Sequence, residues 1–257
     1  MKRILVTNDD GVYSEGIRLL AAELRTLAEV IVVAPDREQS ASGHSLTLQR
    51  PLRMQRIEED VYSVDGTPTD CVNLGVLWLL ADNPPDLIVS GINFGFNLGD
   101  DVTYSGTVSA TFEGTLLGIP SVAFSQEVAE NFSFAAAAGF ARAFVELLCA
   151  RKLPKDLLLN VNIPAGEVTG ISFTKLGHRV YKQSVVEKKD PRGRRYFWIA
   201  GTPKWKNDEG TDHQAVSQGR ISITPLHLDL TDYRGLDSYE WLLRGLNGIK
   251  GEPEERD

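Results

Sequence analysis

Hydrophobic positions along this chain fall into short continuous runs, separated by stretches with the composition of helices. The runs, typical of buried parallel strands, lie at residues 4–6, 30–34, 87–89, 122–124 and 157–161. Helices are predicted between them, at residues 14–27, 71–81, 105–117 and 134–149. The first of these helices keeps its apolar residues at helical spacing, which gives it one face to lie on a sheet. Because strand–helix–strand units connect parallel strands, the pattern predicts an α/β fold.

Polar residues mark where these elements begin and end. Ser14 is placed to cap the first helix, and Thr69 or Asp70 is placed to cap the helix over 71–81. Residues 45–64 alternate loosely between apolar and polar, which suggests a hairpin or an excursion at the sheet edge.

Beyond Pro164 the pattern changes to strands and turns. We expect strands at 171–176 and 220–224, a long hairpin of 180–186 with 196–199, and helices at 212–217 and 238–246. This divides the chain into a core at 1–165, an extension at 166–250 that completes the sheet, and an acidic tail at 251–257. Phe197 and Trp198 would be exposed on an isolated hairpin, so they pack either on a partner chain or on the main domain.

Composition excludes several classes of protein. The chain has 257 residues, 42% of them hydrophobic, and a formal net charge of −8. An acidic balance argues against binding to a nucleic-acid duplex, which usually requires a basic face. No apolar run reaches the roughly 18 residues that span a bilayer, and no signal-peptide pattern is present. Cys71 and Cys149 are expected as buried thiols, and a cytoplasmic protein without a membrane partner fits best.

Oxygen-bearing side chains follow three of the predicted strands. Asp9 and Asp10 end the first strand, Ser40 follows the second and Asn93 the third. Because the carboxyl ends of parallel strands meet at one edge, these residues should lie together. Two adjacent carboxylates repel each other unless a cation compensates them, and this oxygen-only set suits Mg²⁺, Mn²⁺ or Ca²⁺. The alternative is a solvated turn, because Asn-Asp-Asp-Gly is also good turn chemistry.

Other chemistry is less well marked in the sequence. The helix start Ser105-Gly106-Thr107 offers amide donors and hydroxyls for an anion, although ordinary helix capping also explains it. The four histidines (His44, His178, His213 and His227) show no ligand spacing, and we expect structural or exposed roles for them. Gly-x-Gly-x-x-Gly after the first strand, the P-loop motif and Gly-x-Ser-x-Gly are all absent, which argues against dinucleotide-binding, P-loop and nucleophile-elbow proteins.

Five blocks in order resemble the survival protein E (SurE) family. They are KRILVTNDDG, APDREQSASGHSLT, GTPTDC, SGINFGFNLGDDVTYSGTVSAT and TPLHLDLT. The resemblance implies a Rossmann-like three-layer α/β/α core, a C-terminal part used in a homodimer or homotetramer, and a phosphatase that needs one divalent cation. Its substrates would be nucleoside 5′-monophosphates. The family often has proline where this chain has Glu15, which adds negative charge near the anion site.

Carried over by motif, the metal ligands would be Asp9, Asp10, Ser40 and Asn93, the same four residues that the strand ends select. Asp9, Asp10 and Asn93 would also be the catalytic residues. We expect Asn97, Ser105, Gly106 and Thr107 to hold the phosphate of the substrate. Three alternatives stay open: an aspartyl-phosphate intermediate, a metal- or nucleotide-sensing module without turnover, and a structural oligomer with a stabilising cation.

Overall fold

The computed structural model describes residues 1–130, 133–180, 185–199, 204–206 and 208–247. The chain divides into two compact units, residues 1–226 and residues 227–257. The division predicted at residue 165 stays a prediction, and the tail at 251–257 lies outside the described residues.

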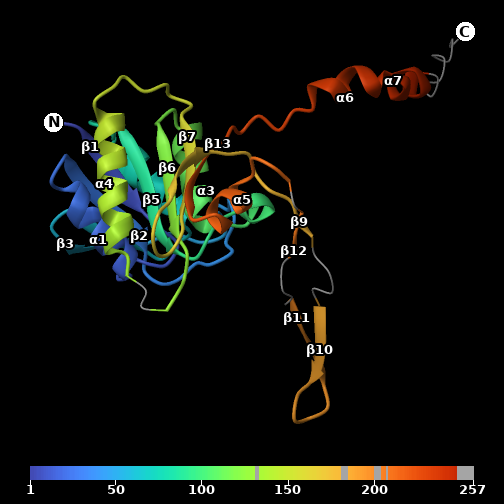
Figure 1. Cartoon of the computed structure of the whole chain (residues 1–257), viewed down its shortest axis with the longest axis horizontal. Coiled ribbons are helices and arrows are strands. Elements are labelled where there is room, and N and C mark those ends of the chain that lie inside the picture. The colour runs from blue at the N-terminus through green and yellow to red at the C-terminus, as the bar shows by residue number, and fades with distance from the viewer. Residues whose placement is uncertain (131–132, 181–184, 200–203, 207, 248–257) are drawn as a thin grey trace, which may run out of the picture. The chain divides into compact units, whose positions relative to one another are not determined.

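A nine-stranded mixed sheet forms the centre of the first unit (Figure 1). In spatial order its strands are β3 (Met54–Glu58), β4 (Val61–Val64), β2 (Glu29–Pro35), β1 (Arg3–Thr7), β5 (Leu87–Phe94), β6 (Ser121–Gln126), β7 (Leu158–Ile163), β13 (Arg220–Pro225) and β8 (Gly170–Phe173). Neighbours from β4 through β7 pair in parallel, whereas β3 is antiparallel to β4 and β13 is antiparallel to β7. The predicted α/β class with a mostly parallel sheet is confirmed.

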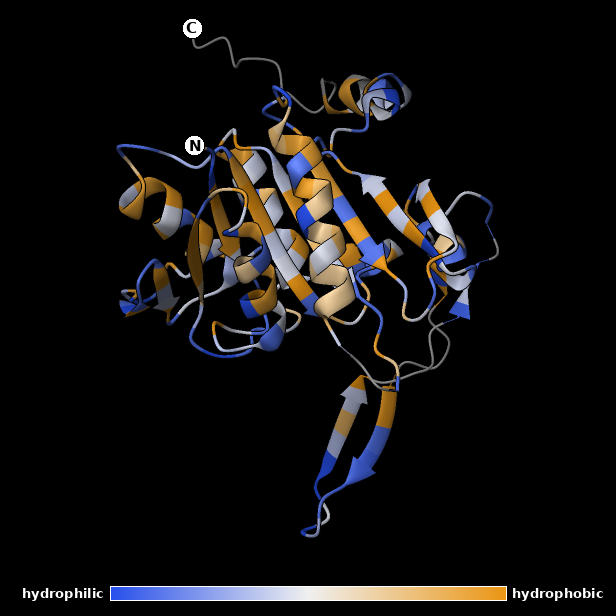
Figure 2. Ribbon diagram, turned by 60° about the vertical axis from the view of Figure 1, so that its left-hand side comes forward, coloured by the Kyte–Doolittle hydropathy of each residue, from blue (hydrophilic) through white to orange (hydrophobic). Residues whose placement is uncertain are grey.

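Helices cover both faces of the sheet (Figure 2). Along β1, Ile4 and Val6 pack in one apolar cluster with residues of α1 (Glu15–Leu24) and α4 (Ala135–Cys149). Leu5 packs in a second cluster with residues of α2 (Pro68–Leu74) and α3 (Gly106–Leu116). Successive side chains of a strand point to opposite faces, so the continuous apolar run of β1 supplies two cores at once. This gives the three α/β/α layers.

The boundaries of α2, α1 and β5 differ from the predictions. Thr67, rather than Thr69 or Asp70, caps α2: Thr67 Oγ1 accepts from Asp70 N at 3.1 Å and Asp70 Oδ2 accepts from Thr67 N at 2.9 Å. This capping box starts the helix at Pro68, and the predicted helix continues beyond Leu74 only as a π-helix, Gly75–Leu79. The helix predicted over 14–27 ends at Leu24. The strand predicted at 87–89 extends to Phe94, because its pairing with β6 resumes at Asn93 after a break.

The segment after β8 carries two smaller antiparallel pairs. β9 (Arg179–Val180) pairs with β12 (Lys204–Trp205), and β10 (Val185–Lys189) pairs with β11 (Arg195–Ile199). The second pair is the predicted hairpin, although the part of it predicted at 181–184 lies outside the described residues. Phe197 and Trp198 are 59% and 60% exposed, so they do not pack on the described part of the main domain. The predicted helix at 212–217 is α5 (Asp212–Ser217).

The second unit contains α6 (Tyr233–Ser238) and α7 (Glu240–Asn247), where one helix over 238–246 was predicted. Four apolar residues of α7 are exposed: Trp241, Leu242, Leu243 and Leu246. No helix in the described part of the chain is long and apolar enough to cross a membrane.

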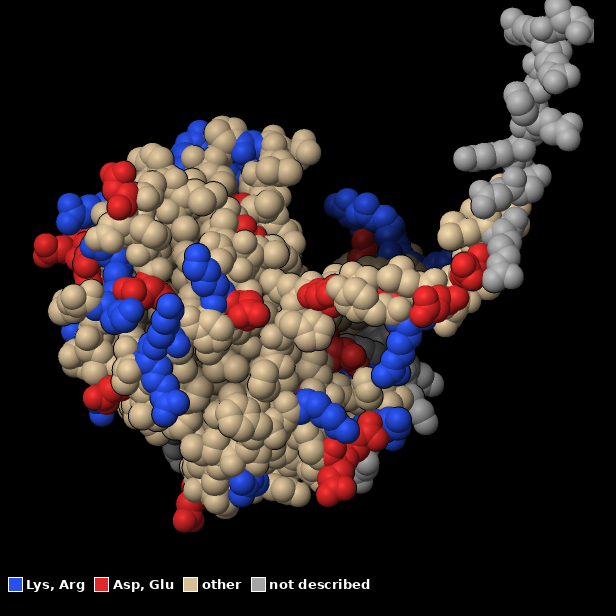
Figure 3. Space-filling model, turned by 90° about the horizontal axis from the view of Figure 1, so that it is seen from above, with Lys and Arg blue, Asp and Glu red and all other residues tan. Residues whose placement is uncertain are grey.

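Charge and thiols complete the description of the surface and the interior. On the face of the first unit seen in Figure 3, Lys and Arg side chains are interspersed with Asp and Glu side chains. Both cysteines are free thiols, with Cys71 buried and Cys149 partly buried.

Candidate active site

The first strand of the sheet ends in a tight turn that carries two aspartates. Asn8 is fully buried, and its Nδ2 donates to Gly11 O at 3.1 Å and to Ser14 Oγ at 2.8 Å. Gly11 has a φ of +96°, and a side chain there would meet the backbone of Arg37 at 3.2 Å. The polar turn is therefore folded closely against the loop that follows β2, and it directs Asp9 and Asp10 to the carboxyl edge of the sheet.

Asp9 lies in an environment that disfavours its charge. It is only 5% exposed, and Thr107 Oγ1, from the first turn of α3, donates to its Oδ1. Burial raises the pKa of Asp9 to about 6, an effect to which the charge of Asp10 adds and which the Thr107 hydroxyl opposes. An ionised Asp9 is thus destabilised until a positive charge approaches it.

Asp10 is less deeply placed and faces β5. Its Oδ2 accepts a hydrogen bond from Phe94 N at 3.3 Å. Burial raises the pKa of Asp10 as well, and the carboxylate of Glu38 adds to this effect while the Phe94 N–H opposes it. Negative charge therefore gathers where β1 and β5 end. Among the described residues, no cationic side chain contributes to the pKa shift of either carboxylate.

The start of α3 closes directly onto Asp9. A side chain at Gly106 would come within 2.7 Å of Asp9 Cβ, within 2.9 Å of Asp9 Oδ2 and within 2.8 Å of Ser42 Oγ. Only glycine fits at such an approach, which brings the first amides of α3 beside the carboxylate. The predicted anion-binding residues Gly106 and Thr107 are therefore brought together with the predicted metal ligand Asp9.

Ser40 and Asn93 come from the neighbouring strands. Gln39 N donates to Asp9 O at 2.7 Å, which holds the loop after β2 beside the aspartates. Ser40 itself is exposed, and its hydroxyl donates to Glu38 Oε1 at 2.6 Å. Asn93 lies within β5, and its Nδ2 donates to Gly95 O at 2.9 Å. Both residues lie at the same edge as the aspartates, although no hydrogen bond between described residues joins either side chain to them.

The other two predicted phosphate ligands make structural contacts. Asn97 is buried, and its Nδ2 donates to Ser125 Oγ at 2.8 Å while its backbone oxygen accepts from Asn160 and Asn162. Ser105 Oγ accepts from Val108 N at 3.1 Å and so caps α3. The structure thus uses Asn97 to hold the loop after β5, and Ser105 to begin the helix.

A divalent cation fits the residues present. No group of three or more His, Cys, Asp or Glu side chains that could hold a metal occurs among the described residues. Two adjacent carboxylates with raised pKa values, together with hydroxyl and amide oxygens, instead form a hard oxygen donor set. Two buried oxygens, Asn8 Oδ1 and Ser42 Oγ, have no hydrogen-bond partner among the described residues, so the edge also holds unsatisfied polar groups.

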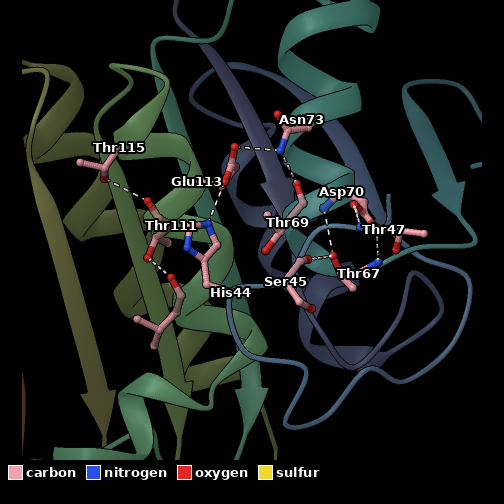
Figure 4. A network of polar contacts seen from close by, with 11 residues as sticks. His44, Ser45, Thr47, Thr67, Thr69, Asp70, Asn73, Thr111, Glu113 and Thr115 are labelled. Carbon is pink, nitrogen blue, oxygen red and sulfur yellow. Dashed lines mark hydrogen bonds and ion pairs between the residues drawn. The ribbon is translucent and has the colours of Figure 1, made fainter. Parts of the chain in front are cut away.

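A polar network beside this site was missed by the reasoning from sequence (Figure 4). His44 Nε2 lies 2.7 Å from Glu113 Oε2, and Asn73 Nδ2 donates to Glu113 Oε1 at 2.8 Å. The sequence feature that could have indicated this network is the position of His44, four residues after Ser40 in a loop rich in small hydroxyl residues. Its partner Glu113 is distant in sequence, and only the fold brings the two together.

Comparison with known proteins gives consistent matches. Residues 4–183 match the family model described as Survival protein SurE. The chain is 52% identical over 256 residues to 5′-nucleotidase SurE of Geobacter sulfurreducens, covering 97% of each protein. It is 49% identical over 252 residues to 5′-nucleotidase SurE of Vibrio cholerae, covering 96% of this chain and 100% of that protein. The crystal structure of the SurE protein from Aquifex aeolicus matches with a TM-score of 0.83 and 46% identity, over 93% of this chain and 99% of that one.

Proposed function

This chain belongs to the SurE family, and from that premise we propose that it hydrolyses nucleoside 5′-monophosphates to nucleoside and phosphate with one divalent cation. The observation that carries the proposal is the approach of the α3 start to Asp9, made possible by Gly106. An acidic cation site and a helix N-terminus suited to anions then lie side by side. A phosphate monoester needs both, because it is an anion that must approach carboxylates.

We assign the cation to Asp9, Asp10, Ser40 and Asn93, with Mg²⁺ or Mn²⁺ as the ion. When bound, such an ion supplies positive charge for the phosphoryl oxygens and lowers the pKa of a bound water. Asp9 is the anchor of the set, because burial makes its ionised form depend most on a nearby positive charge.

The remaining chemistry comes from residues of the chain. Thr107 fixes Oδ1 of Asp9, and Oδ2 lies beside the start of α3 at Gly106. The amides at Gly106 and Thr107 bind the phosphoryl oxygens, and Ser105 and Asn97 keep the helix start and the neighbouring loop in place. Phosphoryl transfer is promoted mainly by positioning and electrostatics, so this arrangement needs no strong base.

Oligomer contacts are part of the same proposal. The apolar residues Phe197 and Trp198 of the hairpin are exposed within the first unit, and Trp241 and Leu243 are exposed within the second. Exposed apolar surfaces of this kind mark protein–protein contacts, and we assign them to a homodimer or homotetramer. We place the enzyme in the cytoplasm, where two free thiols stay reduced.

The test is phosphate release from a panel of nucleoside monophosphates in Mg²⁺, Mn²⁺ or EDTA. Wild type should release phosphate only with the cation, and Asp9→Asn should reduce kcat at least a hundredfold, on the order of the loss of a principal charge contact. Asp82→Asn, which alters an exposed aspartate, is the matched control and should be fully active. Nucleotide binding that requires the cation, without turnover, would contradict the phosphatase and establish a sensor. A covalent phosphate recovered on Asp9 would instead replace water attack by the aspartyl-phosphate route.

A further inference from the structure

The loop that follows β2, residues 39–47 and here termed the serine loop, is fastened to the elements around the site. Four hydrogen bonds join the backbone of the serine loop to residues outside it. They are Gln39 N to Asp9 O at 2.7 Å, Gly43 N to Tyr104 O at 3.1 Å, Thr67 Oγ1 to Ser45 O at 2.8 Å, and Thr47 N to Asp70 Oδ1 at 2.9 Å. Figure 4 shows the last two at the start of α2. A loop without regular secondary structure is thereby held in one path between α2 and α3.

His44 is the serine-loop side chain that reaches α3. Its Nε2 lies 2.7 Å from Glu113 Oε2 (Figure 4). Its ring packs edge-on against Phe112, with centroids 5.9 Å apart. Glu113 is 8% exposed and is also held by Asn73 at 2.8 Å. The hydrogen bond from His44 holds the pKa of Glu113 below its usual value. A buried carboxylate with two fixed donors is a rigid anchor for the loop.

Ser42 is the residue of this loop that points to the acidic site. Its Oγ lies 2.8 Å from the position that a Cβ on Gly106 would occupy, and that position is 2.9 Å from Asp9 Oδ2. The backbone of Ser42 is already used, because its N–H donates to Gln39 O at 3.2 Å and its carbonyl accepts from Ser45 Oγ at 3.0 Å. The hydroxyl is buried and has no partner among the described residues.

A buried hydroxyl without a partner costs free energy, so its retention beside the start of α3 calls for a group that it binds. Asp9 Oδ2 and the Ser42 hydroxyl both lie within 2.9 Å of the position that a Cβ on Gly106 would occupy. We propose that Ser42 donates a hydrogen bond to the phosphoryl group of the substrate, and that His44, through Glu113, is the positioning residue that holds Ser42 there. This rests on the proposed phosphatase function and adds two residues to its site.

His44 acts through the loop rather than on the substrate. Its Nε2 is used by Glu113, and its ring is held against Phe112. Removing His44 should therefore have an effect only while Ser42 is present to be positioned. This gives the proposal a signature, non-additivity, that general destabilisation does not produce.

The experiment compares Ser42→Ala, His44→Ala and the double variant with wild type, in Mg²⁺ buffer. KM and kcat are measured with AMP, and the affinity for inorganic phosphate alone is measured by calorimetry. Ser217→Ala and His178→Ala, which alter exposed residues outside the serine loop, are the matched controls. His44→Gln, whose amide can still donate to Glu113, tests for rescue, and thermal unfolding confirms that each variant is folded.

We expect Ser42→Ala to raise KM and the phosphate dissociation constant about tenfold, with kcat changed less than about twofold, as for a hydrogen bond to an anion. His44→Ala should raise KM similarly, His44→Gln should recover most of the loss, and the double variant should resemble the worse single variant. Unchanged phosphate affinity in Ser42→Ala, or effects that multiply in the double variant, would overturn the proposal. If wild type released no phosphate from any nucleotide, the phosphatase function would fail, whereas the phosphate-binding measurements would still decide the role of Ser42.

Discussion

Replacing Asp9 by asparagine should stabilise the cation-free protein while it abolishes activity. Burial raises the pKa of Asp9 from 3.8 to about 6, so the folded state binds this proton more tightly than the unfolded state. Below pH 3.8 both states hold the proton, and the burial of Asp9 carries no charge penalty. As pH rises through 6, the folded state loses about 3 kcal/mol relative to the unfolded state.

Asparagine removes that penalty at little structural cost. It has nearly the shape of aspartate, and its amide oxygen can still accept the hydrogen bond from Thr107. At about pH 8 in EDTA, we expect Asp9→Asn to unfold with a free energy up to about 3 kcal/mol above that of wild type, and at about pH 4 the two should converge. Mg²⁺ or Mn²⁺ should then stabilise wild type and leave the variant unchanged.

The assay is urea unfolding followed by circular dichroism, at both pH values, with and without the cation. Asp82→Asn controls for the removal of one negative charge from a protein of net charge −8. A lower stability of Asp9→Asn at about pH 8 in EDTA would refute the reasoning, since it would mean that ionised Asp9 is stabilised by its surroundings.

Three further perturbations test other parts of the structure. Gly106→Ala places a methyl group 2.7 Å from Asp9 Cβ, so kcat/KM should fall at least tenfold. Gly139→Ala in α4, where a side chain meets nothing within 4 Å, should instead raise the free energy of unfolding by up to about 1 kcal/mol, as measured by thermal unfolding. Thr67→Ala removes both the cap of α2 and the hydrogen bond to Ser45 O, and should lower the free energy of unfolding in urea by about 1–2 kcal/mol. An unchanged unfolding midpoint would contradict this role of Thr67. Trp198→Asp should lower the assembly mass in light scattering, while Lys189→Ala on the same hairpin should preserve it; an unchanged mass in both would contradict the hairpin contact.

The fold could be predicted from the sequence because its strands are buried on both faces. Continuous runs such as Ile4-Leu5-Val6 have few other uses in a folded chain, and the helices between them fix parallel connections. The ends of the helices and strands were harder to predict, because they depend on single contacts. Thr67 rather than the predicted Thr69 or Asp70 caps α2, because its amide reaches the carboxylate of Asp70 and its hydroxyl accepts from Asp70 N.

Parts of the site were predictable for the same topological reason. The edge that gathers Asp9 and Asp10 with the start of α3 follows from parallel strand order. The contacts of the individual polar side chains could not be predicted from the sequence. Asn97 turns inward to Ser125, and Ser42 turns toward Asp9, because side-chain directions in loops are set by contacts distant in sequence, such as that of His44 with Glu113. The assignment of the metal ligands stays a prediction that the Asp9 variant tests.

The burial of Asp9 also connects stability with catalysis. An ionised Asp9 without a cation lowers the stability of the fold by about 3 kcal/mol at neutral pH. A cation that binds only the folded state, at a hundred times its dissociation constant, returns about 2.7 kcal/mol. At that concentration, the proposed cation would offset most of the stability that an ionised Asp9 removes. In the proposed site, burial of the Asp9 carboxylate, which disfavours its charge, would therefore favour binding of the cation at this edge over exposed aspartates such as Asp82.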